Sequence, residues 1–258
     1  MSVEVHHRVE GPDEAPVVVL VGSLGTTLEM WDEQARALAE RFRVLRYDMR
    51  GHGRSPVPAG PYSIADLAED LVALLDRLGI ERAAICGLSI GGMTAMAAAH
   101  DHPSRVDRLI LCCTSAHMPP AEAWHERATT VRAQGAGAVA DAVLERWFTP
   151  GFAASHPEVV ASLRQGLAET PAEGYASCCE AIADLDLRDS LAAIEAPTLV
   201  ISGAEDPATP PEHGRLIADG IPGASLRIVE GAAHLANIEQ PAAITAALFD
   251  HLGAGATA

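Results

Sequence analysis

The stretch that decides the fold is Gly87-Leu88-Ser89-Ile90-Gly91. A β-forming run at residues 83–86 precedes it, and a run with helical periodicity at residues 91–100 follows it. The pattern G-x-S-x-G between a strand and a helix predicts a sharp turn that exposes the serine hydroxyl at the end of a sheet. Glycines flank the serine because side chains there would collide with the neighbouring strand and helix. Ser89 is therefore the candidate nucleophile.

Strand-like and helix-like segments alternate through most of the chain. Apolar, β-branched runs lie at residues 17–21, 43–47, 83–86, 106–113, 198–201 and 226–229. Helical periodicity marks residues 28–41, 64–78, 91–100 and 242–252. Continuous apolar strands are typical of a parallel sheet that is covered on both faces. The sequence predicts an α/β fold with a mostly parallel central sheet and helices on both faces. Residues 3–9 are expected to form an antiparallel edge hairpin that enters this sheet.

The alternation lapses between residues 117 and 191, where the pattern is helical and is broken by several prolines and glycines. This segment is far longer than an ordinary connection, which needs about a dozen residues. We therefore expect a helical lid at residues 117–191, inserted between two parts of the α/β core at residues 1–116 and 192–252. Residues 253–258 are expected to form a frayed tail.

Charge limits the partners that this chain can have. It carries 18 basic and 35 acidic side chains, a net charge of −17, which repels nucleic acids and anionic membranes. All the basic residues are arginine, so mechanisms that need a Schiff-base or P-loop lysine are excluded. Neither a nucleic-acid partner nor a membrane partner is expected, and the sequence leaves a homo-oligomer open.

Cysteine usage and the N-terminus bear on the compartment. The five cysteines are odd in number and have no C-x-x-C spacing, which predicts buried, reduced thiols. The first residues lack a basic flank followed by an apolar run, and no apolar stretch approaches the roughly 20 residues of a membrane span. We expect a cytoplasmic protein.

A serine nucleophile needs a base and an acid that follow it in the chain. His234, in Gly231-Ala232-Ala233-His234-Leu235, follows one predicted strand and precedes the last helix, so it is the candidate base; His213 and His117 remain alternatives. Asp206 follows the strand at residues 198–201 and is the candidate acid, with Glu205 as its competitor. Asp206 is preferred because the shorter residue before Pro207 suits a tight turn.

The same chemistry requires two backbone N–H groups that bind an oxyanion. One comes from the residue after the nucleophile, here Ile90. The other comes from the loop after the first inner strand, Gly22-Ser23-Leu24-Gly25-Thr26-Thr27, in which Leu24 is placed to donate. The glycines of this loop match neither a Walker nor a dinucleotide-binding pattern.

These residues together resemble the α/β-hydrolases, and Asp48-Met49-Arg50-Gly51-His52-Gly53-Arg54-Ser55 is similar to a structural turn common in that superfamily. More narrowly, the chain resembles the 3-oxoadipate enol-lactonases of the β-ketoadipate pathway. The stretches that carry this resemblance lie at residues 23–32, 42–48, 87–93, 146–149 and 234–241. The chain departs from the family's usual residues at Ile90, where methionine is usual, and at Ala236, where serine is usual.

The resemblance implies that Ser89, His234 and Asp206 open 3-oxoadipate enol-lactone, a small anionic lactone, without a metal ion or other cofactor. The substrate carboxylate needs a local positive charge in this acidic protein. Arginines of the predicted lid are candidates, with Arg146 first because it lies in the family-like Arg146-Trp147-Phe148-Thr149. The other candidates are Arg127, Arg132 and Arg164. Trp124 and Trp147 are candidates for the pocket wall.

Other readings of the same residues remain open. A small-ester carboxylesterase or a cofactor-free perhydrolase of the haloperoxidase type uses the same fold and the same nucleophile. A non-catalytic receptor that keeps the pocket as a ligand site is a further alternative, because a fold and a motif do not guarantee turnover.

The nucleophile is tested by replacing its hydroxyl. The Ser89→Ala variant is expected to fold normally and to lose several orders of magnitude in turnover, because only oxyanion and binding contributions remain. Steady-state kinetics and circular dichroism together check this expectation. Activity close to that of the wild type would remove Ser89 from the role of nucleophile.

Overall fold

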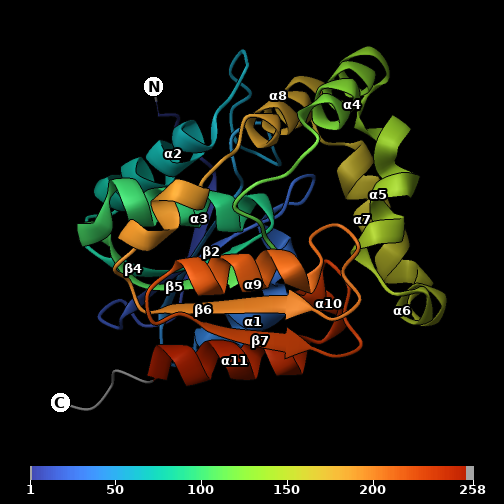
Figure 1. The fold of residues 1–258 in the computed structure, drawn as a ribbon. Helices are drawn as coiled ribbons and strands as arrows, with labels where there is room; N and C mark the ends of the chain where they lie inside the picture. Colours follow the sequence, from blue (N-terminus) through green and yellow to red (C-terminus); the bar gives the residue numbers. More distant parts are fainter. Residues whose placement is uncertain (1, 254–258) are drawn as a thin grey trace.

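The computed structural model describes residues 2–253 and contains a seven-stranded sheet (Figure 1). The order of the strands across the sheet is β1-β3-β2-β4-β5-β6-β7. Their bounds are β1 (His7–Glu10), β2 (Val17–Val21), β3 (Arg43–Tyr47), β4 (Ala83–Leu88), β5 (Val106–Cys112), β6 (Thr198–Gly203) and β7 (Ser225–Val229). Every pairing except that of β1 is parallel, so the predicted α/β fold is confirmed.

The first strand corrects one expectation. β1 is an antiparallel edge strand, as predicted, but it does not form a hairpin with the next strand, β2. It pairs with β3 instead, with His7 opposite Tyr47. The reason is that β2 lies inside the sheet, where β3 and β4 occupy both of its edges. The outer edge of β3 is therefore the edge that remains open to β1.

Helices cover both faces of the sheet (Figure 1). On one face lie α1 (Asp32–Leu38) and α11 (Pro241–Gly253), and on the other lie α2 (Ile64–Arg77), α3 (Ile90–Asp101) and α9 (Pro211–Gly220). The helix predicted at residues 28–41 begins as a short 3-10 turn at Leu28–Trp31 before it continues as α1. The predicted tail lies outside the described residues except for Gly253, which ends α11.

The helix α3 is buried from residue 90 to residue 99. Its sequence, rich in alanine and glycine, presents little side-chain volume, so its backbone lies close to the sheet. Most helices of a domain bury a single stripe, whereas this helix is enclosed on all sides. The turn that leads into α3 is consequently held by a well-packed core.

Five helices lie between β5 and β6 in the chain. They are α4 (Ala121–Gln134), α5 (Ala140–Trp147), α6 (Pro150–Ser155), α7 (Pro157–Ala168) and α8 (Ala172–Ala183). Figure 1 shows α5, α6 and α7 on the side to which the arrowheads of β6 and β7 point. The two ends of this segment are held together by a β-bridge between His117 and Asp186 and by the Leu187 N–H, which donates to the Ala116 carbonyl at 2.8 Å. The helical character predicted for this segment is confirmed, while its division from the core remains a prediction.

All five cysteines are buried with free thiols, as the sequence predicts. Between residues 2 and 253, no helix combines the length and the apolar character that a membrane span requires.

Candidate active site

Ser89 sits at the turn between β4 and α3 with φ 59° and ψ −122°. A residue other than glycine rarely adopts a positive φ, and such strain persists only where the surrounding structure holds it. Here the Ser89 N–H donates to the Cys112 carbonyl at 3.0 Å, and the Ser89 carbonyl accepts from the Thr114 hydroxyl at 2.6 Å. Hydrogen bonds from the end of β5 therefore fix the turn on both sides of the serine.

The glycines on either side of Ser89 are required by close backbone approach. A Cβ atom on Gly87 would lie 2.1 Å from the Gly91 carbonyl oxygen, and one on Gly91 would lie 2.5 Å from the Val21 carbonyl oxygen. Both distances are far below van der Waals contact. The G-x-S-x-G pattern is thus the steric condition for placing α3 directly after β4.

His234 and Asp206 form a buried pair. His234 Nδ1 lies 2.9 Å from Asp206 Oδ2, and the two side chains are 5% and 0% exposed. Asp206 also accepts hydrogen bonds from the Ala208 and Thr209 N–H groups and from the Thr209 hydroxyl. Burial alone raises the pKa of the Asp206 carboxyl, but His234 and Thr209 outweigh burial and hold that pKa below its ordinary value. The carboxylate is charged, so it orients the ring with Nδ1 as donor and leaves Nε2 for chemistry.

The competing residues lie elsewhere. Glu205 is exposed and forms no hydrogen bond with His234, whose carboxylate partner among the described residues is Asp206. His213 Nδ1 lies 2.7 Å from the Ser115 hydroxyl, and His117 Nδ1 lies 3.0 Å from the Leu185 carbonyl oxygen. The structure therefore brings Asp206 and His234 together and leaves the three alternatives outside this pair.

The loop that contains Leu24 is held by the turn at residues 48–55. The Gly25 N–H donates to His52 Nε2 at 2.9 Å, and the Leu28 N–H donates to Asp48 Oδ1 at 2.8 Å. Burial lowers the pKa of His52, so its ring is neutral and can accept this hydrogen bond. Among the described residues, the N–H groups of Leu24 and Ile90 donate to no protein acceptor. Both donors thus remain available for an oxyanion.

A cavity joins these groups. Its lining comes from the loop after β2, from the turn at Ser89, from α4, α5 and α8, and from the loops that carry Asp206 and His234. The lining residues are Ser23, Leu24, Ser89, Met93, Met118, Trp124, Arg127, Val143, Arg146, Trp147, Tyr175, Ile182, Ala208, Thr209 and His234. Ser89 and His234 therefore face one common space, and no aspartate or glutamate of residues 2–253 lines it.

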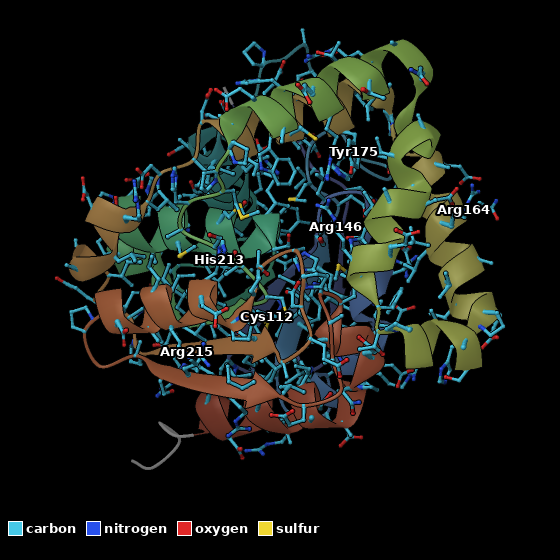
Figure 2. The ribbon with its side chains drawn as sticks, turned by 45° about the vertical axis from the view of Figure 1, so that its right-hand side comes forward. Cys112, Arg146, Arg164, Tyr175, His213 and Arg215 are labelled. Atoms are coloured by element: carbon cyan, nitrogen blue, oxygen red, sulfur yellow. The ribbon has the colours of Figure 1, made fainter. Side chains whose placement is uncertain are left out.

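The predicted substrate contacts divide into two groups. Arg146, Trp124 and Trp147 line the cavity, as does Arg127. Arg132 and Arg164 do not line it: Arg132 binds Glu173 and Glu180, and Arg164 binds Asp141. Figure 2 shows Arg146 toward the centre of the molecule and Arg164 on its outer side.

Known proteins share both the sequence and this architecture. Residues 16–241 match the family model described as the alpha/beta hydrolase fold. The chain belongs to the α/β-hydrolase family. It is 42% identical to 3-oxoadipate enol-lactonase 2 of Acinetobacter baylyi over 96% of this chain and 92% of the relative. The expected resemblance to the enol-lactonases, and with it the prediction of a hydrolytic enzyme, is confirmed.

Two solved structures are similar to this α/β-hydrolase in both sequence and fold. The enol-lactonase from Burkholderia xenovorans is 46% identical, with a TM-score of 0.95 over 97% of each chain. A thermophilic esterase from Thermogutta terrifontis, solved with malate bound, is 33% identical, with a TM-score of 0.93 over 97% of this chain and 93% of the other.

Thr209, Tyr175 and Glu239 are among the residues of the site that the sequence patterns did not predict. Thr209 follows Asp206 at the spacing of a side-chain turn, a signal that sequence reasoning could have used. Tyr175 lines the cavity from α8 without any local signal. Glu239 is buried and accepts from the Thr149 N–H at 2.9 Å, from the Thr149 hydroxyl at 2.5 Å and from the Ala233 N–H at 2.7 Å. Glu239 therefore connects Thr149, between α5 and α6 of this α/β-hydrolase, to the loop that carries His234.

The acid is tested by a matched pair of variants. Asp206→Asn is expected to lower kcat by roughly 10⁴-fold, because an amide stabilises the wrong tautomer of His234. Glu205→Gln, one residue away and exposed, is expected to change kcat little. Measurement of kcat for both variants decides the assignment, and the reverse ranking would transfer the role to Glu205.

The role of Glu239 is tested by stability. Glu239→Gln replaces an acceptor oxygen with an amide donor that faces an N–H or a hydroxyl, so the free energy of unfolding is expected to fall by about 1–3 kcal/mol. Urea denaturation measures this change, with exposed Glu205→Gln as the control. Equal stability of the two variants would show that the contacts of Glu239 with Thr149 and Ala233 contribute nothing to stability.

Proposed function

We propose that this protein hydrolyses 3-oxoadipate enol-lactone to 3-oxoadipate, in the β-ketoadipate pathway of aromatic catabolism. The observation that carries the proposal is the cavity lined by Ser89, by His234, which Asp206 orients from outside the lining, and by two arginines, with no carboxylate of residues 2–253 in the lining. Such a cavity suits an anionic ester. The similarity to the Acinetobacter baylyi and Burkholderia xenovorans enol-lactonases supports the same substrate.

In the first half of the reaction, the Ser89 hydroxyl attacks the lactone carbonyl while His234 Nε2 takes its proton. Asp206 keeps the Nδ1 proton on the ring and stabilises the imidazolium that forms. The N–H groups of Leu24 and Ile90 bind the oxyanion of the tetrahedral intermediate. Collapse of this intermediate breaks the bond between the acyl carbon and the ring oxygen, which leaves as an enolate and remains tethered to the acyl group.

The second half of the reaction releases the product. His234 first delivers its proton to the departing enolate oxygen and then takes a proton from water, which attacks the ester on Ser89. The bond between the acyl carbon and Ser89 Oγ breaks, His234 returns the proton to Oγ, the acid is released, and the enol tautomerises to the ketone. An enolate is a better leaving group than an ordinary alkoxide, so ring opening demands less of the general acid. Every step uses a group of this chain, and the proposal includes no metal ion or other cofactor.

The location of the enzyme is part of the proposal. Five buried, free thiols support a reducing compartment, because disulfides are rare there. We therefore place the activity in the cytoplasm.

A small-ester carboxylesterase is the second candidate. The similarity to the Thermogutta terrifontis esterase favours it, and the same serine, base and oxyanion donors serve an acyclic ester. The two functions differ in one respect. An enol-lactonase uses contacts to the carboxylate of its substrate to stabilise the transition state, whereas an esterase acting on neutral esters does not.

The comparison of two substrates decides between them. Freshly generated 3-oxoadipate enol-lactone is expected to exceed p-nitrophenyl acetate in kcat/KM by about 10²-fold or more, because contacts to the remote carboxylate are used to stabilise the transition state. Initial rates are followed by ultraviolet absorbance at matched ionic strength. A higher kcat/KM for the neutral ester would establish the esterase instead.

A further inference from the structure

We propose that Arg127, Arg146 and the Tyr175 hydroxyl together form the subsite that binds the carboxylate of the substrate. The inference rests on the proposed function and adds the residues that select an anion. The two arginines of the cavity differ from most other arginines of the described chain in their ion pairs.

Most arginines of this protein already have a carboxylate partner. Of the eighteen arginines, all within the described residues, twelve form ion pairs: Arg8, Arg36, Arg46, Arg50, Arg82, Arg105, Arg108, Arg132, Arg164, Arg188, Arg215 and Arg227. Arg127 and Arg146 form none with any described residue. Arg41, Arg43, Arg54 and Arg77 also form no ion pair with a described residue, but they lie outside the cavity. Arg127 and Arg146 differ from them because both line one cavity that has no aspartate or glutamate of residues 2–253 in its lining. An anionic ligand would supply the missing charge.

Both arginines line the cavity that Ser89 and His234 line, and neighbouring contacts restrain the Arg127 guanidinium and the backbone beside Arg146. The guanidinium of Arg127 lies over the Trp124 ring, 4.6 Å from the centroid, in a cation–π contact. Arg146 precedes Trp147, whose carbonyl accepts from the Leu235 N–H at 3.0 Å. The backbone of α5 beside Arg146 is thus tied to the loop that carries His234.

Tyr175 supplies an independent indication of a ligand. Its side chain is fully buried and lines the cavity, yet its O–H has no acceptor in the described chain, because Arg127, which approaches the hydroxyl, is a donor only. A Cβ atom built on Gly25, next to Leu24, would lie 3.1 Å from the Tyr175 ring. A buried O–H without an acceptor costs free energy, and a ligand oxygen in the cavity would remove that cost.

The protonation of these groups favours an acceptor ligand. Burial raises the pKa of Tyr175, and Arg127 offsets only part of that rise, so the hydroxyl remains a donor. Guanidinium groups are donors only and match the two oxygens of a carboxylate. Two guanidinium groups and one hydroxyl therefore form a set of donors that selects carboxylate over a neutral group of similar size.

The experiment compares anionic and neutral substrates in single variants. Arg127→Gln and Arg146→Gln are each expected to lower the ratio of kcat/KM for the enol-lactone to that for p-nitrophenyl acetate by roughly ten- to hundredfold. Arg127→Lys and Arg146→Lys, which keep the charge, are expected to fall between these variants and the wild type. Arg164→Gln is the matched control, a lid arginine that is exposed and paired with Asp141, and it should leave the ratio unchanged.

Tyr175→Phe separates binding from structure. Because the O–H has no acceptor in the described part of the free protein, its removal should not lower the melting temperature. It should lower the ratio of kcat/KM for the enol-lactone to kcat/KM for p-nitrophenyl acetate by about tenfold. A lower melting temperature with an unchanged ratio would assign Tyr175 a purely structural role. An unchanged ratio in both arginine-to-glutamine variants would overturn the subsite.

Inhibition by adipate, a six-carbon dicarboxylate, tests the subsite without the lactone. Adipate should inhibit the hydrolysis of p-nitrophenyl acetate competitively, with an inhibition constant that rises at least tenfold in Arg127→Gln and Arg146→Gln but not in Arg164→Gln. If the wild type fails to open the lactone but shows this pattern, the proposed function is wrong and the anion subsite stands. If the lactone is opened and adipate inhibits all variants equally, the subsite is wrong and the function stands.

Discussion

The backbone of Ser89 is the constraint on which the rest of the site depends. A positive φ between a strand and a helix persists only because β5 holds the turn through Cys112 and Thr114, and because Gly87 and Gly91 allow the chain to pass without collision. The same turn fixes the direction of the Ile90 N–H. The nucleophile and one oxyanion donor are thus positioned by a single feature of the core, before any substrate enters.

Electrostatics act in opposite directions at two distances. The net charge of −17 repels an anionic substrate that approaches the protein. Salt weakens this repulsion at distances beyond the Debye length, which is about 10 Å at 0.1 M ionic strength. Inside the cavity the sign is reversed, since Arg127 and Arg146 line it and no acidic side chain of the described residues does. Asp206 remains negatively charged beside His234, and its carboxylate accepts a hydrogen bond from the Thr209 hydroxyl. The local arrangement of charge therefore matters more to the site than the composition.

Local patterns predicted the parts of the molecule that local rules determine. The parallel strands, the turn at Ser89 and the positions of Asp206 and His234 each follow from a strand and the few residues after it. Tertiary contacts determine the rest. The pairing of β1 with β3, the proximity of Glu239 to Thr149, 90 residues away, and the place of Tyr175 in the cavity depend on how distant segments fold together. The sequence likewise ranked Arg146 above Arg127 without revealing that both line the cavity.

The central claim, that Ser89 is a nucleophile activated by His234, is tested most directly by covalent trapping. Incubation with diethyl p-nitrophenyl phosphate should release one p-nitrophenolate per chain and leave one phosphoryl group on Ser89, located by mass spectrometry of its peptide. His234→Ala is expected to slow this labelling strongly, because the Ser89 hydroxyl then lacks its base. Absence of an adduct, or an adduct on a residue other than Ser89, would contradict the account.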